Sequence, residues 1–221
     1  MKDEKTSKTG KISKKTFILT CIVVLLPMVV GLILWKRLPE EIVTHFGSDG
    51  VANGWSSKGA AVFGLPLFVL FVHMLCVGIT LQDPKIANMN EKMLALILWI
   101  CPVVSVFMTI SIYGYELGYD MNVEKIAMVM VSLLFVILGN YLPKCKPNYT
   151  VGIKLPWTLD SEENWNRTHR LAGFVWVIGG LVMLVNAFLG VEWLMLVVML
   201  VLVFIPTGYS FLYYLRHGKQ E

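Results

Sequence analysis

The sequence is poor in charged residues. Asp, Glu, Lys and Arg make up only 15% of its 221 residues, whereas hydrophobic types make up 56%. Soluble domains carry about 25% charged residues, because they need a hydrated surface. The deficit excludes an ordinary soluble domain of this length and indicates a membrane protein.

The sequence also lacks the residue spacings that bind metals or carry out catalysis. Its four cysteines form no C-x-x-C pair and suggest no disulfide. It has no H-E-x-x-H motif, P-loop, nucleophile elbow or Gly-rich dinucleotide fingerprint. We therefore predict no metal site, no cofactor and no enzymatic activity.

Acidic and basic residues are missing from the middle of six hydrophobic runs. Each run is close to the ~20 residues that a helix needs to cross the hydrocarbon core of a bilayer. The runs cover residues 16–35, 59–81, 93–115, 126–142, 171–188 and 193–214. The predicted fold class is an all-α membrane protein with six transmembrane helices.

Polar groups at membrane depth are few. The only histidine and amide side chains inside the runs are His73, Asn140 and Asn186. Transporters and proton relays usually carry ionisable groups at this depth, because such groups are costly there and persist when they have a function. A proton-coupled mechanism is therefore disfavoured, whereas a passive or partner-dependent exporter of a peptide or small molecule remains an alternative.

Lysine and arginine are distributed unevenly between the connections. With the N-terminus inside, the outer side holds Lys36, Arg37, Lys58 and Lys125. The inner side holds Lys2, Lys5, Lys8, Lys11, Lys14, Lys15, Lys85, Lys92, Lys144, Lys146, Lys154, Arg167, Arg170, Arg216 and Lys219. Basic residues stay on the cytoplasmic side of spans, which predicts a multi-pass cell-membrane protein with both termini cytoplasmic. This asymmetry accounts for the positive net charge, so we expect no direct binding of nucleic acid.

Three segments follow from this layout. Residues 1–15 are predicted to form a basic disordered arm attracted to anionic membrane lipids. Residues 16–125 form an N-terminal half with helices 1–3 and an outer loop, 36–58. Residues 126–221 form a C-terminal half with helices 4–6 and an inner loop, 143–170. The short connections near residues 82–92, 116–125 and 189–192 are interpreted as plain turns.

The outer loop carries the pattern of a small hairpin-like cap. Residues 42–46 are rich in β-branched and aromatic types, and residues 47–50 form a turn signal. Asn53-Gly54 is interpreted as a second turn, because this pair favours positive φ. We expect Trp55 at headgroup depth and Lys58 reaching to the membrane interface. His45 is expected to make a structural hydrogen bond or to contact an external ligand.

The inner loop is predicted to be structured rather than a flexible linker. Pro143, Pro147 and Pro156 fix φ and bias the preceding residues away from helix, which predicts an extended, turn-rich stretch. Asp160 and Glu163 have the spacing of an N-terminal capping pair. A helix is therefore expected from about residue 161 into the fifth run.

That helix is predicted to have a buried and a hydrated side. Helical spacing places Trp165, Thr168, His169 and Ala172 close to one face. The residues expected toward water or headgroups are Glu162, Glu163, Arg167 and Arg170. Trp157 and Trp165 are suited to the interface, where an apolar ring stays buried while its N–H finds a polar partner.

The inner-loop residues resemble the signature of the SdpI immunity-protein family. The resemblance rests on Gly139-Asn140-Tyr141-Leu142-Pro143, Pro147-Asn148-Tyr149, Gly152-Ile153, Pro156-Trp157-Thr158-Leu159, Trp165 and Thr168-His169-Arg170. The outer-loop residues Leu38-Pro39, His45-Phe46, Gly50, Trp55 and Lys58 resemble a domain of unknown function that often precedes that signature. Together the resemblance covers about residues 16–215.

The resemblance implies a bacterial membrane protein that protects the cell from a secreted toxic peptide. It also implies a signalling role, in which a cytoplasmic transcriptional repressor is held at the membrane. Two other classes stay open: the exporter, and a membrane enzyme that uses His169. Expected partners are thus membrane lipids, a toxic peptide on the outer side and a repressor on the inner side.

Two groups of candidate site residues result. The outer-loop group, expected to contact a ligand or form the cap, is Pro39, His45, Phe46, Gly50, Trp55 and Lys58. The inner-loop group, expected to pack internally or contact a partner, is Asn140, Pro143, Asn148, Gly152, Pro156, Trp157, Thr158, Trp165, Thr168, His169 and Arg170.

Overall fold

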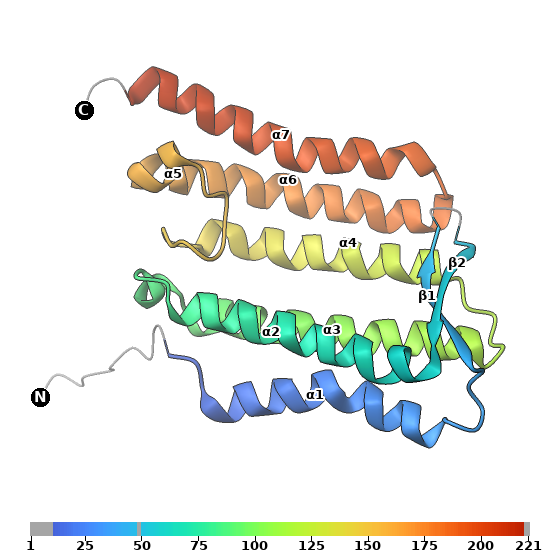
Figure 1. Cartoon of the computed structure of the whole chain (residues 1–221). Coiled ribbons are helices and arrows are strands. Elements are labelled where there is room, and N and C mark those ends of the chain that lie inside the picture. The colour runs from blue at the N-terminus through green and yellow to red at the C-terminus, as the bar shows by residue number, and fades with distance from the viewer. Residues whose placement is uncertain (1–10, 48–49, 219–221) are drawn as a thin grey trace, which may run out of the picture. The chain divides into compact units, whose positions relative to one another are not determined.

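The structure is a computed structural model that describes residues 11–47 and 50–218 (Figure 1). Six of its helical segments are long and apolar enough to cross a membrane, which confirms the predicted fold class. The elements are α1 (Lys14–Ile33), β1 (Glu41–Phe46), β2 (Ala52–Ser57), α2 (Leu65–Leu81), α3 (Glu91–Glu116), α4 (Val123–Tyr141), α5 (Pro156–Asp160), α6 (Glu162–Leu189) and α7 (Glu192–His217). Residues 1–10 of the predicted arm lie outside the described residues, and its last two residues, Lys14 and Lys15, belong to α1.

The chain divides into two compact units. The first, here called the hairpin unit, comprises Lys11–Gln82 and Leu94–Ile126. The second, called the loop unit, comprises Asp83–Met93 and the described part of Ala127–Glu221. The loop unit therefore includes the connection between α2 and α3, which is distant in sequence from the rest of that unit.

Three helices of the hairpin unit are joined by polar contacts as well as by apolar packing. Thr20 of α1 and the Nε2 atom of His73 of α2 are 3.0 Å apart, and both residues are fully buried. Ser105 of α3 donates to the carbonyl oxygen of Val24 at 3.0 Å. Hydrogen bonds between helices satisfy polar groups that lipid cannot solvate, so these contacts join α1 to both α2 and α3.

Strands β1 and β2 form the predicted hairpin as a two-stranded antiparallel sheet. Gly50 has a φ of 72°, a left-handed conformation that glycine adopts without strain. The interpretation of Asn53-Gly54 as a second turn was wrong, because both residues lie inside β2. Gly54 is instead the partner of His45 at an irregular point of the register, and a Cβ there would lie 2.9 Å from the Cβ of His45.

The hairpin is attached to its unit by an apolar core at its base. The fully or nearly buried side chains of this core are Leu38, Ile42, Ala61, Val62, Ile112 and Tyr113. They come from β1 and the connection before it, from the π-helical turn Ala60–Gly64 that precedes α2, and from the last part of α3. Burial of these side chains holds the hairpin against the ends of the helices.

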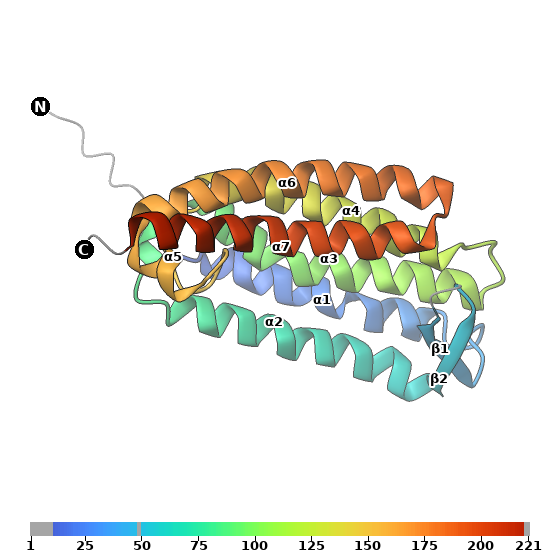
Figure 2. The ribbon, with the colours of Figure 1, turned by 90° about the horizontal axis from the view of Figure 1, so that it is seen from above.

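Helices α4, α6 and α7 of the loop unit pack closely through glycines (Figure 2). A Cβ at Gly139 of α4 would lie 2.8 Å from the backbone nitrogen of Val177, and one at Gly180 of α6 would lie 2.8 Å from the backbone oxygen of Ser132. On another side of α6, a Cβ at Gly179 would lie 2.6 Å from Leu202 of α7. Small residues let membrane helices approach until their backbones touch, and this gain in packing stabilises the unit.

This packing predicts that Gly180→Ala destabilises the protein by about 1–3 kcal/mol, because backbone atoms must move to admit the new methyl group. Gly208→Ala in α7 is the matched control, since a Cβ there meets none of the described residues within 4 Å and alanine is the better helix former. Thermal unfolding of the full chain in detergent micelles measures both variants. Equal melting temperatures would contradict the close approach of α4 and α6.

Candidate functional site

Most of the polar residues of the inner-loop group lie together in the loop unit. We define the loop core as the buried set Cys145, Asn148, Thr158, Asn164, Trp165, Thr168 and His169. Each of these residues exposes 2% or less of its surface. The predicted buried face of the helix after residue 161 is confirmed, and Glu162, Glu163, Arg167 and Arg170 are exposed as expected.

Asn148 organises the extended part of the loop. Its carbonyl oxygen accepts from the backbone N–H groups of Thr150 and Val151 at 3.0 and 2.7 Å. Its amide group donates to the carbonyl oxygen of Lys146 at 2.8 Å and to the sulfur of Cys145 at 3.2 Å. An asparagine side chain offers two acceptor and two donor positions. All four are used here to hold a tight turn.

The stacked side chains of His169 and Trp165 pack directly against the backbone of this turn. The Nε2 atom of His169 accepts from the backbone N–H of Ile153 at 2.9 Å, so Nδ1 carries the proton and donates to the carbonyl oxygen of Trp165 at 2.8 Å. The two rings are stacked with centroids 4.0 Å apart. Both ring nitrogens of His169 are thus bonded to backbone groups, which supports a positioning function and not the acid–base role of the enzyme alternative.

Gly152 is the position where the loop backbone lies against the rings of His169 and Trp165. Its φ is 121°, a conformation that other residues rarely adopt. A Cβ at this point would collide with Nε2 of His169 and would lie 3.0 Å from the Trp165 ring. Only glycine fits between the loop backbone and the two stacked rings.

The start of the long helix differs from the predicted cap by one residue. Ser161, not Asp160, is the N-cap of α6, and its hydroxyl accepts from the N–H of Asn164 at 3.2 Å. Asp160 instead ends the short helix α5, which the sequence pattern did not predict. The reason is Thr158, whose hydroxyl oxygen accepts from the N–H of Leu155 at 2.9 Å and donates toward the carbonyl oxygen of Ile153 at 2.8 Å. These bonds stabilise one helical turn before α6.

A second polar cluster joins this region to α7. Asn164 donates to the backbone oxygen of Ser210 at 3.1 Å, and its side-chain oxygen accepts from Thr168 at 2.9 Å. The indole N–H of Trp157 donates to the hydroxyl of Ser210 at 2.8 Å, which leaves Trp157 partly exposed beside α7. Trp165 does not lie at an interface as expected, because it is 0% exposed and donates to the carbonyl oxygen of Cys145 at 2.7 Å.

The connection between α2 and α3 was wrongly interpreted as a plain turn. Asp83 is 5% exposed, and its carboxylate accepts from the N–H of Tyr149 at 2.8 Å and from the hydroxyl of Thr150 at 2.7 Å. Its other oxygen accepts from the N–H of Lys85 at 2.8 Å. The side-chain amide of Asn88 donates to the carbonyl oxygen of Pro147 at 2.7 Å. The connection therefore holds the inner loop at two points.

Lys58 of the outer-loop group does not reach to the membrane interface. It is 6% exposed and lies 2.9 Å from a carboxylate oxygen of Glu40. Its ammonium also donates to the carbonyl oxygen of Trp35 at 3.2 Å and lies over the Trp35 ring. The prediction failed because an exposed carboxylate and a backbone carbonyl within the hairpin unit bind the ammonium of Lys58, so this charge is satisfied internally.

Two further residues of the outer-loop group are used in holding the hairpin. The ring of Phe46 meets that of Tyr115 edge to face, with centroids 5.3 Å apart. Nδ1 of His45 is hydrogen-bonded to the side-chain oxygen of Asn53, which gives His45 the structural contact that was one of its two expected roles. Trp55 differs from both, because 56% of its surface is exposed.

The other candidate residues lie at the edges of these clusters. Gly50 is beside Glu124 in the hairpin unit, and Pro39 is exposed. In the loop unit, Asn140, Pro143, Pro156 and Arg170 are exposed. Pro143 nevertheless has a packing role, because its ring fills the space where a Cβ of Gly173 would be. The structure therefore brings the buried members together and leaves these residues outside.

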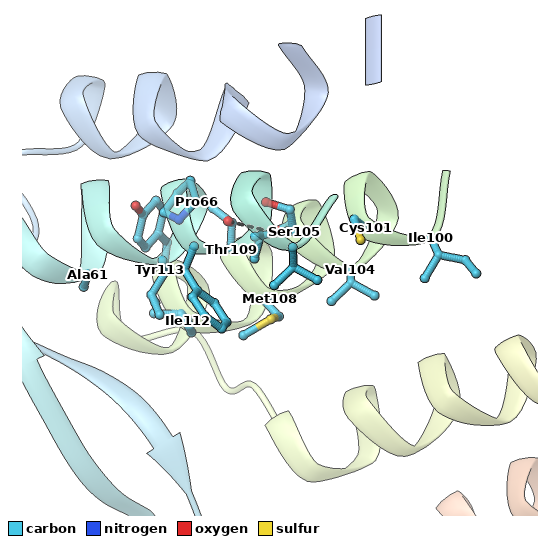
Figure 3. A pocket seen from close by; sticks show the side chains of 14 residues that line it. Ala61, Pro66, Ile100, Cys101, Val104, Ser105, Met108, Thr109, Ile112 and Tyr113 are labelled. Carbon is cyan, nitrogen blue, oxygen red and sulfur yellow. Dashed lines mark hydrogen bonds between the residues drawn. The ribbon is translucent and has the colours of Figure 1, made fainter. Parts of the chain in front are cut away.

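The hairpin unit also contains an apolar cavity of about 340 Å³ between α2 and α3 (Figure 3). Its polar lining groups are largely occupied: Ser105 donates to Val24 in α1, and Thr109 donates to the carbonyl oxygen of Ser105 at 2.8 Å. The remaining wall includes Pro66, Met108 and Ile112. Such a surface accepts apolar groups and offers little to a polar ligand.

Comparison with known proteins places both loops in a known context. Residues 144–210, which include the loop core, match the model of the SdpI/YfhL protein family. Residues 22–70, which include the hairpin, match a domain of unknown function, DUF1648. The resemblance seen in the sequence is confirmed.

One relative is similar to nearly the whole chain. The "Immunity protein SdpI" of Bacillus subtilis (strain 168) is 28% identical over 207 residues, which cover 90% of this chain and 96% of that protein. No solved structure matches the chain.

Sequence reasoning missed four residues that hold the site together. Asn164 and Ser210 carry no signal of their own, because polar residues in apolar helices have many roles. Cys145 was considered as a possible disulfide or metal-binding residue, but its carbonyl oxygen and sulfur both take part in the loop core. Asp83 had a readable signal, namely an acid beside Pro84 directly after a span, but its partners are 66 and 67 residues away.

The first prediction from this site concerns Cys145. Burial raises the pKa of its thiol to about 11, although the hydrogen bond from Asn148 opposes the shift. At pH 8 the reactive thiolate is therefore only about one part in a thousand. We expect N-ethylmaleimide to modify Cys145 slowly in the folded protein and rapidly after unfolding, with the rate rising as the pH approaches 11. Peptide mapping by mass spectrometry measures this, and rapid modification at pH 8 would contradict the burial.

The second prediction concerns the bonds from Asp83. Asp83→Asn replaces an acceptor oxygen by a donor, so it cannot keep all three bonds and should cost about 1–3 kcal/mol. Thr150→Val removes one of the same bonds, so the double variant should lose about 1 kcal/mol less than the sum.

Thermal unfolding of the full chain in detergent measures the two single variants and the double variant. Glu91→Gln is the matched control, because Glu91 is an exposed acid in the same segment. Strictly additive effects of Asp83→Asn and Thr150→Val would show that the two side chains do not interact.

Proposed function

We propose that this protein is an integral membrane immunity protein that protects its cell against a secreted toxic peptide. The observation that carries the proposal is the similarity to the "Immunity protein SdpI", which extends over 90% of the chain and includes both loops. A relationship confined to apolar helices would be weak support, because such helices resemble one another in composition. Here the matched ranges contain the specific polar contacts of the loop core.

The two loops support a division of roles between the two membrane faces. The hairpin precedes α2 and Asp83 follows it, so a membrane crossed by α2 separates the hairpin from the loop core. Lysine and arginine are concentrated on the loop-core side, which we infer to be cytoplasmic. The hairpin then faces the outside, where a secreted peptide arrives.

We infer that the hairpin makes the first contact with the peptide. Trp55 and Val51 are 56% and 60% exposed, whereas the aromatic residue Phe46 is engaged with Tyr115. Exposed tryptophan at headgroup depth suits an amphipathic peptide, because its ring binds apolar side chains and its N–H binds polar ones. Glu41 adds an exposed acid on the paired strand β1, whereas the charge of Glu40 is paired with Lys58.

The implied repressor partner stays a prediction. Asn148, Thr158 and His169 make their hydrogen bonds within the chain, so they are occupied by internal packing. A soluble partner would have to contact exposed residues at this end of the loop unit, such as Tyr149 and Lys154.

The proposal predicts that expression in a sensitive bacterial host raises the lethal concentration of at least one peptide in a panel of membrane-active peptides. Trp55→Ala should lower that protection by about 30-fold, the typical effect of removing a central tryptophan from a binding surface. Trp193→Ala is the matched control, because Trp193 is 66% exposed at the start of α7. Protein levels in the membrane are measured for both variants.

Three results would contradict parts of the proposal. If the protein protects against no peptide in the panel, the proposed immunity function is wrong. If both tryptophan variants lose protection equally, the proposed contact between the hairpin and the peptide is wrong. Gradient-driven uptake of labelled peptide by inverted vesicles favours the exporter. As a control for orientation, an impermeant maleimide applied to intact cells should label Glu41→Cys and spare Lys92→Cys.

A further inference from the structure

A polar pocket lies at the end of the loop unit where α6 begins and α7 ends. In Figures 1 and 2 these two helix ends lie beside α5. The pocket has a volume of about 370 Å³. It is lined by Glu163, Arg167, Tyr209, Leu212, Tyr213, Arg216 and His217, and we call it the α6–α7 pocket.

The charges in this pocket are not balanced. Arg167 is paired with the single acid, because its terminal nitrogen lies 2.8 Å from the Glu163 carboxylate and its Nε donates to the same oxygen at 2.9 Å. The Arg167 guanidinium also lies over the Tyr213 ring, 5.4 Å from the centroid. Arg216 forms no ion pair within residues 11–47 and 50–218. One guanidinium is thus left for an anion from outside.

Aromatic side chains give the pocket a firm wall. The rings of Tyr213 and His217 are stacked with centroids 4.2 Å apart, and Nδ1 of His217 lies 3.1 Å from the carbonyl oxygen of Tyr213. Tyr209 continues the stack on the other side of Tyr213, with centroids 6.5 Å apart. Stacked rings at one-turn spacing hold their positions without an added ligand, so the polar edge of the pocket is formed in advance.

The pocket lies where the lipid-facing surface changes from apolar to polar. Along α7 the exposed side chains are apolar at Val203, Phe204 and Ile205, and again at Leu212. They are followed by tyrosine, arginine and histidine at the helix end. Tyrosine and basic residues at the end of a span mark headgroup level. Basic pockets between the ends of membrane helices bind anionic lipid headgroups.

We propose that the α6–α7 pocket binds the phosphate of an anionic phospholipid headgroup. Arg216 supplies the unpaired positive charge, and Arg167 is held in place by Glu163 to form the opposite wall. Leu212 lies at the rim, where it contacts the lipid below its phosphate. This site is independent of the immunity function, because it uses no residue of the hairpin or of the loop core.

The experiment measures lipid binding to the detergent-solubilised full chain by native mass spectrometry. Phosphatidylglycerol and phosphatidylcholine are compared, because they differ in charge at the headgroup. We expect phosphatidylglycerol to bind more tightly, and Arg216→Gln to weaken that binding about fivefold, the effect of one basic residue near an anionic surface. Arg216→Lys should keep most of the affinity, because the positive charge remains.

Arg37→Gln is the matched control, with the same loss of charge at an exposed arginine after α1 in the hairpin unit. Loss of binding in Arg216→Gln but not in Arg37→Gln supports the site. Equal loss in both variants, or no preference between the two lipids, overturns it. Displacement of the lipid by an equal concentration of inorganic phosphate would show that a free phosphate is bound, which also overturns the lipid assignment.

Discussion

The loop unit depends on one constraint, which is that backbone polar groups buried away from water must be hydrogen-bonded. Residues 145–155 contain no helix or strand, so the regular ladders of secondary structure cannot satisfy their N–H and C=O groups. Side chains do this instead. Asn148 and Asp83 accept hydrogen bonds from backbone N–H groups of the turn at residues 149–151. His169 accepts from the N–H of Ile153, and Thr158 accepts from the N–H of Leu155.

The same constraint explains why this connection contains so many residues of special shape. Gly152 is required because the backbone lies directly on the rings of His169 and Trp165. The flat indole of Trp165 fills the space beneath while its N–H bonds to Cys145. A loop that is satisfied in this way behaves like part of a core, since removal of one partner leaves a buried polar group unpaired. Its residues therefore act together, and a substitution at one position affects bonds made by the others.

The two loops use polar residues differently. At the base of the hairpin, the buried ammonium of Lys58 is paired with the exposed carboxylate of Glu40, whereas the Trp55 side chain is exposed. In the loop core, the side chains turn inward and bind backbone. The hairpin thus leaves one large aromatic side chain exposed, whereas the loop core connects α4, α6 and α7 within the loop unit.

Much of this arrangement was readable from the sequence. Apolar runs of about 20 residues determine six helices, because an unpaired backbone is too costly in lipid. Helical spacing also predicted the buried face of Trp165, Thr168 and His169, since residues three and four apart share a side. The family resemblance identified both loops, because the family models match ranges that contain the hairpin and the loop core.

Tertiary structure decided the rest. Asp83 lies beside Thr150 only because the folded loop unit brings two separate connections together, and no local pattern records a partner 67 residues away. Lys58 turned inward because Glu40, the carbonyl oxygen of Trp35 and the Trp35 ring all contact its ammonium. Gly54 lies inside a strand opposite His45, where a Cβ would have little room. The sequence by itself determined which segments span the membrane, since that depends on local composition, whereas the polar contacts depend on which distant residues the folded chain brings together.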